Sequence, residues 1–269
     1  MFDSHCHLDL SAFDSDRAEV LRRAQGADLS GLLVPGVRPS TFAQVEALRT
    51  EADAPLPIVI AIGVHPQVAD QLSADELAFA TDPDAIAAAA EKARAVAIGE
   101  CGLDGGTPAP ERQEEILRAH IRAARATGLP LVLHVLRAHQ AAPRLFREER
   151  LSEVGGVMHS YSGGADLVRV YQDLGLCFSV AGPVTFPGSR RPWQAARTIP
   201  ADLLLAETDS PDQTPHPHRG KRNEPAFLRE VIAALAQARG VPFEEMAVVT
   251  SRNARRLFRL PEPPRQAFS

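Results

Sequence analysis

Short apolar runs alternate with longer segments of helical character along the chain, about eight times. The runs are typical of buried strands, and Gly128 and Gly175 end helices just before the next run. The strands predicted in this way are Phe2–His7, Ser30–Pro35, Pro57–Ile62, Ala95–Glu100, Leu131–His134, Gly156–His159, Cys177–Val180 and Leu203–Glu207. The predicted helices are Ala18–Ala24, Thr41–Glu51, Ala85–Arg94, Glu111–Thr127, Gln140–Glu149, Ala165–Leu174, Gln194–Thr198, Ala226–Arg239 and Phe243–Arg256.

Repeated strand–helix units require parallel strands joined by right-handed crossovers, and eight such units most often close into a (β/α)8 TIM barrel. A doubly wound open sheet is the alternative, but no G-x-G-x-x-G sequence follows the first strand. The length of 269 residues suits a barrel, which typically has ~250. We therefore expect a single α/β barrel domain over residues 1–269, with a frayed tail at 261–269.

Composition narrows the class of protein. Hydrophobic residues make up 45% of the chain, which is enough for a large core. The net charge is −5, so a nucleic acid could bind only through a local basic patch or a metal ion. The three cysteines have no paired spacing, which is typical of a reducing cytoplasm. Asp3, His5 and His7 stand where a signal peptide would be apolar, and no apolar run is long enough to cross a membrane. We expect a cytoplasmic monomer with no membrane partner.

Histidines and carboxylates gather where the predicted strands end. His5 and His7 are one residue apart, so on a strand both side chains point the same way. In a parallel barrel the carboxyl ends of all strands meet at one mouth, so residues at these ends become neighbours in space. The other residues of this kind are His65, Glu100, His134, His159 and Asp209.

This combination of donors predicts a metal centre. Mixed histidine and carboxylate ligands suit a first-row divalent metal or Zn²⁺. Without His65, four imidazoles and two carboxylates remain, and six ligands exceed what one catalytic ion takes. Two ions ~3.5–4 Å apart, bridged by a carboxylate, would use them all. Glu100 is the natural bridge because it has two oxygens and enough reach. Asp209 is the natural base because a carboxylate beside the metal can deprotonate a bound water.

The chain resembles the TatD family of metal-dependent deoxyribonucleases, within the amidohydrolase-like barrels. The resemblance spans nearly the whole chain and is carried by motifs that are rarely found together. They are Phe2-Asp-Ser-His-Cys-His-Leu-Asp9, Gly63-Val-His-Pro66, Ile98-Gly-Glu-Cys-Gly-Leu-Asp104, Leu131-Val-Leu-His134, Met158-His-Ser-Tyr-Ser-Gly163, Leu204-Leu-Ala-Glu-Thr-Asp-Ser-Pro211, Gly220-Lys-Arg-Asn-Glu-Pro225 and Asn253-Ala-Arg-Arg-Leu-Phe258.

The resemblance implies two divalent ions per chain, Mg²⁺, Mn²⁺ or Zn²⁺. His5, His7 and Glu100 would hold one ion, with Asp209 against it, and Glu100, His134 and His159 would hold the second. Family members are usually Mg²⁺-dependent, whereas four histidines favour a softer ion. His65 resembles the family's substrate-side histidine near the scissile phosphate; the alternative is a turn residue before Pro66.

The loops that would contact substrate depart from the family's pattern. Gly105-Gly106 stands where charged or aromatic residues are frequent, Val135-Leu-Arg137 replaces the common Ser-Arg-Asp, and Asp212-Gln213 replaces an aromatic-Leu pair. The family's metal chemistry is therefore a firmer expectation for this chain than the family's substrate. Arg137 is the cation that we expect to contact substrate.

The leading interpretation is a hydrolase that cuts the phosphodiester bonds of DNA, as a 3′-5′ exonuclease on single-stranded ends. The alternative is a small-molecule amidohydrolase, lactonase or phosphoesterase on the same barrel, because one fold serves many reactions. A binding protein with a vestigial site is a third possibility, which the intact set of six ligands disfavours.

The basic loop at 211–225 either contacts phosphates or is simply solvated. His120 and His139, on helical stretches, are expected at the surface, and Trp193 either stacks on a base or packs internally.

Overall fold

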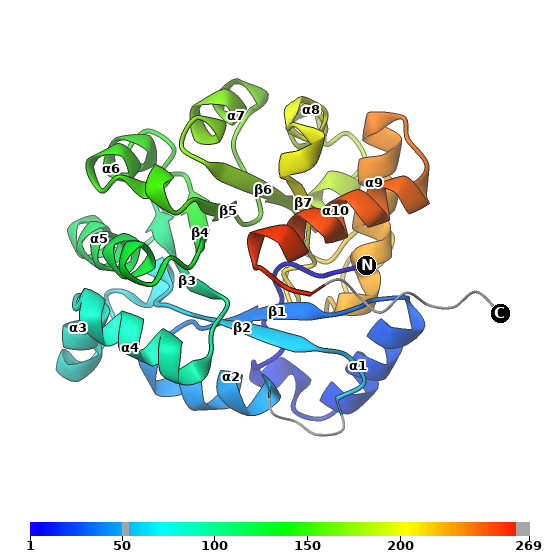
Figure 1. Ribbon diagram of the computed structural model, residues 1–269. Helices are drawn as coiled ribbons and strands as arrows, with labels where there is room; N and C mark the ends of the chain where they lie inside the picture. Colours follow the sequence, from blue (N-terminus) through cyan, green and yellow to red (C-terminus); the bar gives the residue numbers. More distant parts are fainter. Residues whose placement is uncertain (50–53, 262–269) are drawn as a thin grey trace.

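Seven parallel strands form one curled sheet in the computed structural model, which describes residues 1–49 and 54–261 (Figure 1). The strands pair in chain order from β1 to β7, so the sheet has no switch point of the kind that a doubly wound fold requires. The bounds are β1 (Leu32–Pro35), β2 (Ile58–Ile62), β3 (Ala97–Asp104), β4 (Leu131–Leu136), β5 (Gly156–Met158), β6 (Leu176–Val180) and β7 (Leu204–Ala206). The predicted barrel class is confirmed.

The predicted first strand, 2–7, is not regular. It forms a single parallel bridge, between Asp3 and Leu32. Its amides nevertheless alternate between neighbours: Asp3 N–H and Cys6 N–H donate to the β1 side, and Ser4 N–H donates to the carbonyl of Ala206 in β7. The segment thus fills the gap between the first and last strands of the sheet.

Helices surround the sheet, as expected from the crossover connections (Figure 1). Their bounds are α1 (Arg17–Gly26), α2 (Phe42–Arg49), α3 (Ala74–Ala80), α4 (Pro83–Ala93), α5 (Pro110–Thr127), α6 (Ala142–Glu148), α7 (Ala165–Gln172), α8 (Arg190–Thr198), α9 (Leu228–Arg239) and α10 (Phe243–Leu257). Helix α3 was not predicted, although Ser73 and Glu76 form the capping box that marks its start. The end of the predicted helix 41–51 and the tail from 262 lie outside the described residues.

The barrel interior is a small apolar cluster of its own. Each strand contributes one inward residue, mostly small or β-branched, and α10 adds Ala254 and Phe258 from one end. Figure 1 shows α10 lying across that end of the barrel, beside the N-terminal segment. Since α10 closes the amino end, only the carboxyl end of the strands is left for a site. The inward strand residues are Leu33, Ala61, Ala97, Val132, Val157, Cys177 and Leu205.

None of the helices in the two described ranges combines the length and apolarity that a membrane crossing requires. That residues 1–269 form a single monomeric domain stays a prediction.

Candidate metal centre

Strand alternation places most of the site residues. Two positions beyond the inward Val132 lies His134, and two beyond Val157 lies His159, so both imidazoles continue the interior toward the carboxyl end. By the same spacing Glu207 follows the inward Leu205. The structure therefore brings these side chains to one mouth, as the sequence predicted for the two histidines.

Glu100 points inward because of an irregularity in β3. The pairing of β3 with β4 shifts by one residue between Ile98 and Cys101, so β3 carries an extra residue there. Without this bulge, Glu100 would share the outward direction of Ile98. Gly99 permits the close packing, because a Cβ at that position would lie 2.4 Å from the carbonyl oxygen of Val132.

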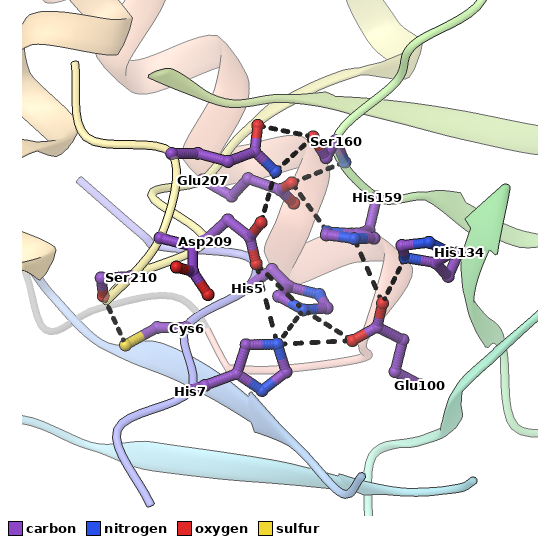
Figure 2. Close-up of polar contacts among 12 residues, drawn as sticks. His5, Cys6, His7, Glu100, His134, His159, Ser160, Glu207, Asp209 and Ser210 are labelled. Carbon is purple, nitrogen blue, oxygen red and sulfur yellow. Dashed lines mark hydrogen bonds and ion pairs between the residues drawn. The ribbon is translucent and has the colours of Figure 1, made fainter. Parts of the chain in front are cut away.

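The carboxylate of Glu100 lies at the centre of the site and is fully buried. Figure 2 shows one oxygen facing His134 and His159 and the other facing His5 and His7. Oε1 is 3.0 Å from Nδ1 of His134 and 3.1 Å from Nε2 of His159. Oε2 is 3.0 Å from Nε2 of His5 and 3.5 Å from Nε2 of His7. The four imidazoles thus form two pairs, one on each carboxylate oxygen.

Asp209 completes the side occupied by His5 and His7. Its Oδ1 is 3.7 Å from Nε2 of each of these histidines, and its Oδ2 accepts a hydrogen bond from Gln213. Gln213 also bonds to Ser160 at 2.7–2.9 Å. Asp209, Ser160 and Gln213 all have positive φ, at 55°, 41° and 51°. Backbone held in this sparsely populated region is frequent at functional sites.

Two further carboxylates orient histidines of the centre. Nδ1 of His159 donates to Oε1 of Glu207 at 3.0 Å, and Nε2 of His134 lies 3.6 Å from Oδ2 of Asp104. In each case one ring nitrogen faces Glu100 and the other faces the outer carboxylate, which is the usual arrangement of metal-binding histidines. No role was predicted for Glu207 from the sequence. Its spacing of two residues from Asp209 was the available signal.

The charges of the centre depend on one another. Burial by itself raises the pKa of Glu100, but the imidazoles of His65, His159 and His5 outweigh burial and hold that pKa well below its usual range. Burial lowers the pKa of His7, yet Glu100 and Asp209 overcome it and raise the value to about 9. Histidines bind metal through an unprotonated nitrogen, so acid must compete with metal at this site.

The donor atoms fit divalent metal ions. Ligands ~2.0–2.2 Å from a common ion at tetrahedral or octahedral angles stand ~3–3.5 Å apart. The distances from Glu100 to His5, His7, His134 and His159 are 3.0, 3.5, 3.0 and 3.1 Å. Oε2 of Glu100 is buried and accepts no hydrogen bond from any described residue, which a cation would remedy. Three groups of donors therefore lie close enough to hold an ion, namely His5, His7 and Glu100; His5, His159 and Asp209; and His65, Glu100 and His134. The first is a predicted set, whereas the third contains His65 where the prediction has His159.

His65 lies at the same centre but with a different protonation. Its Nε2 is 3.1 Å from Oε1 of Glu100 and 3.3 Å from Nδ1 of His134. Its Nδ1 accepts a hydrogen bond from the backbone N–H of Gln67, at the start of the short 3-10 helix η3 (Pro66–Val68). Burial lowers the pKa of the His65 imidazole, and because Nδ1 accepts this bond, the ring proton lies on Nε2. That nitrogen is a donor, which suits contact with substrate better than metal ligation.

Arg137 directly follows β4 in an exposed position with φ 53°. In the described ranges its guanidinium makes no hydrogen bond and no ion pair, so it is free for an anion. The neighbouring glycines accommodate it: a Cβ at Gly105 would lie 2.5 Å from its carbonyl oxygen, and one at Gly106 would lie 3.0 Å from its Nη1. This packing explains why the loop reads Gly-Gly here.

Other expectations about polar residues were wrong in part. His120 is fully buried, not at the surface: its Nδ1 donates to the carbonyl of Ile116 and its Nε2 accepts from the amide of Val64. His139 is half-buried, with Nδ1 2.8 Å from the hydroxyl of Tyr171.

Two more residues have internal partners. In the basic loop, Arg222 is paired with Asp16 at 2.8 Å, so it is not free for phosphate. The indole N–H of Trp193 donates to the carbonyl of Val184, which is the packing alternative.

A parallel barrel whose strand ends collect histidines around a buried carboxylate defines the class of metal-dependent hydrolases. The chain matches the model of the TatD related DNase family over residues 2–259, and it belongs to this family. It is 36% identical over 262 residues to the uncharacterized metal-dependent hydrolase YabD of Bacillus subtilis, a match that covers 97% of this chain and 99% of that one.

Two further comparisons agree with this assignment. A relative from Rahnella sp., named 3′-5′ ssDNA/RNA exonuclease TatD, is 35% identical over 270 residues and covers 97% and 98% of the two chains. The crystal structure of YjjV, a TatD homologue from Escherichia coli K12, superposes with a TM-score of 0.87 at 30% identity, over 97% of this chain and 98% of that one. The resemblance drawn from the sequence motifs is confirmed.

Proposed function

We propose that the protein hydrolyses phosphodiester bonds of DNA with two divalent metal ions, and that it removes nucleotides from single-stranded 3′ ends. The observation that carries this proposal is Glu100, whose two oxygens each face a separate pair of imidazoles. Nucleic acid as the substrate class is supported by the name of the family model and by the name of the Rahnella relative.

The residues that would hold the ions follow from the two pairs. His5, His7 and Oε2 of Glu100 would hold one ion, and His134, His159 and Oε1 of Glu100 the other. Mg²⁺, Mn²⁺ and Zn²⁺ are the candidates, and the four imidazoles favour the softest of them, Zn²⁺. Bound there, such ions supply Lewis acidity and a water of lowered pKa.

Asp209 is the proposed general base. Gln213 donates to Oδ2 and so restrains the carboxylate, with Oδ1 directed at His5 and His7. A carboxylate held in this way can take the proton of the attacking water while the strained backbone keeps its position.

His65 and Arg137 are the proposed substrate contacts. The Nε2–H of His65 is fixed by the bond from Gln67 to Nδ1 and can donate to a phosphoryl oxygen. The free guanidinium of Arg137 suits a phosphate because its planar fork binds two oxygens. The remaining alternative is a small-molecule ester, lactone or amide. An apolar cavity beside the centre, with a volume of about 460 Å³, has room for a molecule of this kind as well as for part of a nucleotide.

A panel of substrates tests the proposal. The protein is stripped with a chelator, reloaded with Mg²⁺, Mn²⁺ or Zn²⁺ and incubated with single-stranded DNA labelled at either end, duplex DNA, RNA, a lactone and a small phosphodiester. We expect metal-dependent shortening of single-stranded DNA from the 3′ end. Hydrolysis of the small substrates without cleavage of any nucleic acid would support the alternative instead.

Glu100→Gln tests the bridging role in the same assay. The amide keeps the shape of the side chain but loses the charge that holds two cations close together, so we expect reduced metal content and strongly reduced activity. Glu91→Gln, the same change at an exposed position of α4, is the control. Equal metal content in Glu100→Gln and the parent would contradict a bridge.

A further inference from the structure

A cavity of about 460 Å³ opens beside the centre on the side of His134 and His159. It lies where the carboxyl ends of β4, β5 and β6 meet the short helix η5 (Gly182–Thr185) and the start of α8. Its volume falls within the ~300–1,000 Å³ typical of small-molecule sites. Most of its lining is apolar, and the main apolar residues are Val135, Leu136, Val180, Ala181, Val184 and Pro192.

The cavity is continuous with the metal centre, because His134 and His159 line both. An occupant must therefore be part of the molecule whose reacting bond lies at the centre. Among the described residues no lysine or arginine lines the cavity, so apart from the two histidines at its mouth it offers no cationic side chain to a phosphate. An uncharged group fits this lining.

The hydroxyl and amide side chains of the cavity already bond to other groups of the protein. Ser160 and Gln213 bond to each other, Gln213 also donates to Asp209, and Ser162 donates to the carbonyl of Val135 at 3.1 Å. They are poorly placed to read the donor and acceptor pattern of a ligand. Recognition in this cavity should then depend on shape and apolar contact.

We propose that this cavity holds the base of the 3′-terminal nucleotide and is the site where the enzyme recognises its substrate. Resting on the proposed nuclease function, the assignment follows from chemistry: among the parts of a nucleic acid, the base is the one that is planar, largely apolar on its faces and uncharged. Sequence-tolerant contact of this kind suits an enzyme that removes successive nucleotides whatever their identity. The residues that line the cavity thus select for the presence of a base at the 3′ terminus but discriminate little among the four bases.

The test uses oligonucleotides that differ in one base. The metal-loaded enzyme is given single-stranded DNA with a normal 3′-terminal nucleotide, the same strand with an abasic 3′ terminus, and a strand whose abasic nucleotide lies far from the 3′ end. We expect kcat/KM for the abasic 3′ terminus to fall at least ~10-fold, as for loss of one stacked base, and the distant abasic nucleotide to have no effect on the first cut. Equal rates for the normal and abasic 3′ termini would overturn the proposal.

Two variants locate the effect in the cavity. Ala181→Leu fills it, so we expect the normal strand to lose most of its advantage while the abasic strand is cut within ~2-fold of the parent rate. Ala88→Leu, the same change at an exposed position of α4, is the control and should change neither rate. Leu136→Ala, at a half-buried position, enlarges the cavity and should reduce the advantage of the normal strand if Ala181→Leu fails to fold.

The outcomes separate this proposal from the nuclease function. If Ala181→Leu or Leu136→Ala slowed both strands equally, the cavity would not be the base site although the enzyme would still be a nuclease. If no nucleic acid were cut with any metal, the nuclease function would fail and this proposal with it.

Discussion

Replacement of Glu207 should weaken metal binding although this residue faces away from the proposed ions. Glu207 is fully buried, and its Oε1 accepts from Nδ1 of His159 at 3.0 Å and from the amide of Ser160 at 2.6 Å. Its Oε2 accepts no hydrogen bond within the described part of the chain. In Glu207→Gln the amide oxygen can keep both bonds at the Oε1 position, so the ring of His159 stays oriented but loses the adjacent negative charge. In Glu207→Ala both bonds are lost.

The size of the effect follows from this difference. Loss of an outer carboxylate from a metal-binding histidine typically costs ~10–100-fold in metal affinity or activity, or ~1.4–2.7 kcal/mol. We expect Glu207→Gln near the lower value, because only the charge changes. Glu207→Ala should reach the upper value, because His159 is then free to rotate and the amide of Ser160 is left without its acceptor.

A competition titration measures the effect directly. Each variant, stripped of metal, competes with a fluorescent chelator for Zn²⁺ or Mn²⁺, and a thermal melt checks that it is folded. Glu245→Gln, at an exposed position of α10, is the matched control. A folded Glu207→Ala variant that binds metal as tightly as the parent would refute the orienting role.

Three other changes have distinct expected results. Asp209→Asn should keep its metal content but lower kcat at least ~10²-fold, measured by initial rates beside elemental analysis; a loss of activity only in proportion to lost metal would make it a ligand. Burial lowers the pKa of His120 from 6.5 to about 4, so the unfolded chain binds the proton first and the free energy of unfolding should fall by ~2 kcal/mol from pH 7 to 5. Denaturant titrations at several pH values should show this loss of free energy in the metal-free parent but not in metal-free His120→Gln. An equal dependence of the unfolding free energy on pH in the two proteins would contradict the assignment to His120. Replacing both Arg219 and Lys221 with Gln should raise KM for DNA and flatten the salt dependence of KM. Arg222→Gln should instead reduce stability, because it breaks the ion pair with Asp16. An unchanged salt dependence in the double variant would mean that Arg219 and Lys221 are solvated surface residues without a role in DNA binding.

The apolar runs predicted the sheet because a strand covered on both faces must be apolar throughout. That signal says nothing about irregular backbone. The segment 2–7 does not form a ladder, since the side chain of Asp3 accepts from the amides of His5 and Thr208 that regular pairing would use. The inward direction of Glu100 depends on the extra residue in β3, which strict alternation does not reveal.

The ligand set could be predicted because parallel strands end at one mouth, whereas the supporting residues could not. The outer carboxylate Glu207 precedes a more conspicuous Asp209, and its role depends on the position of His159 on a distant strand. For His120 a signal did exist: it lies four residues after Ile116 and seven after Gln113, on the buried face of α5. A polar residue at that spacing is expected to have an internal partner.

The bonds between the N-terminal segment and the residues after β7 have a consequence for biosynthesis. His5 and His7 lie on the segment that joins β1 to the end of β7, and the amide of Thr208 reaches the side chain of Asp3 across 205 residues of sequence. Contacts of such long range form late, because the chain between them must first be ordered. A growing polypeptide therefore carries its first two histidines from the start but cannot assemble the centre until the last strand has left the ribosome. Metal uptake would thus report the completion of folding, and an N-terminal fragment that ends before Thr208 should be synthesised without acquiring its ions.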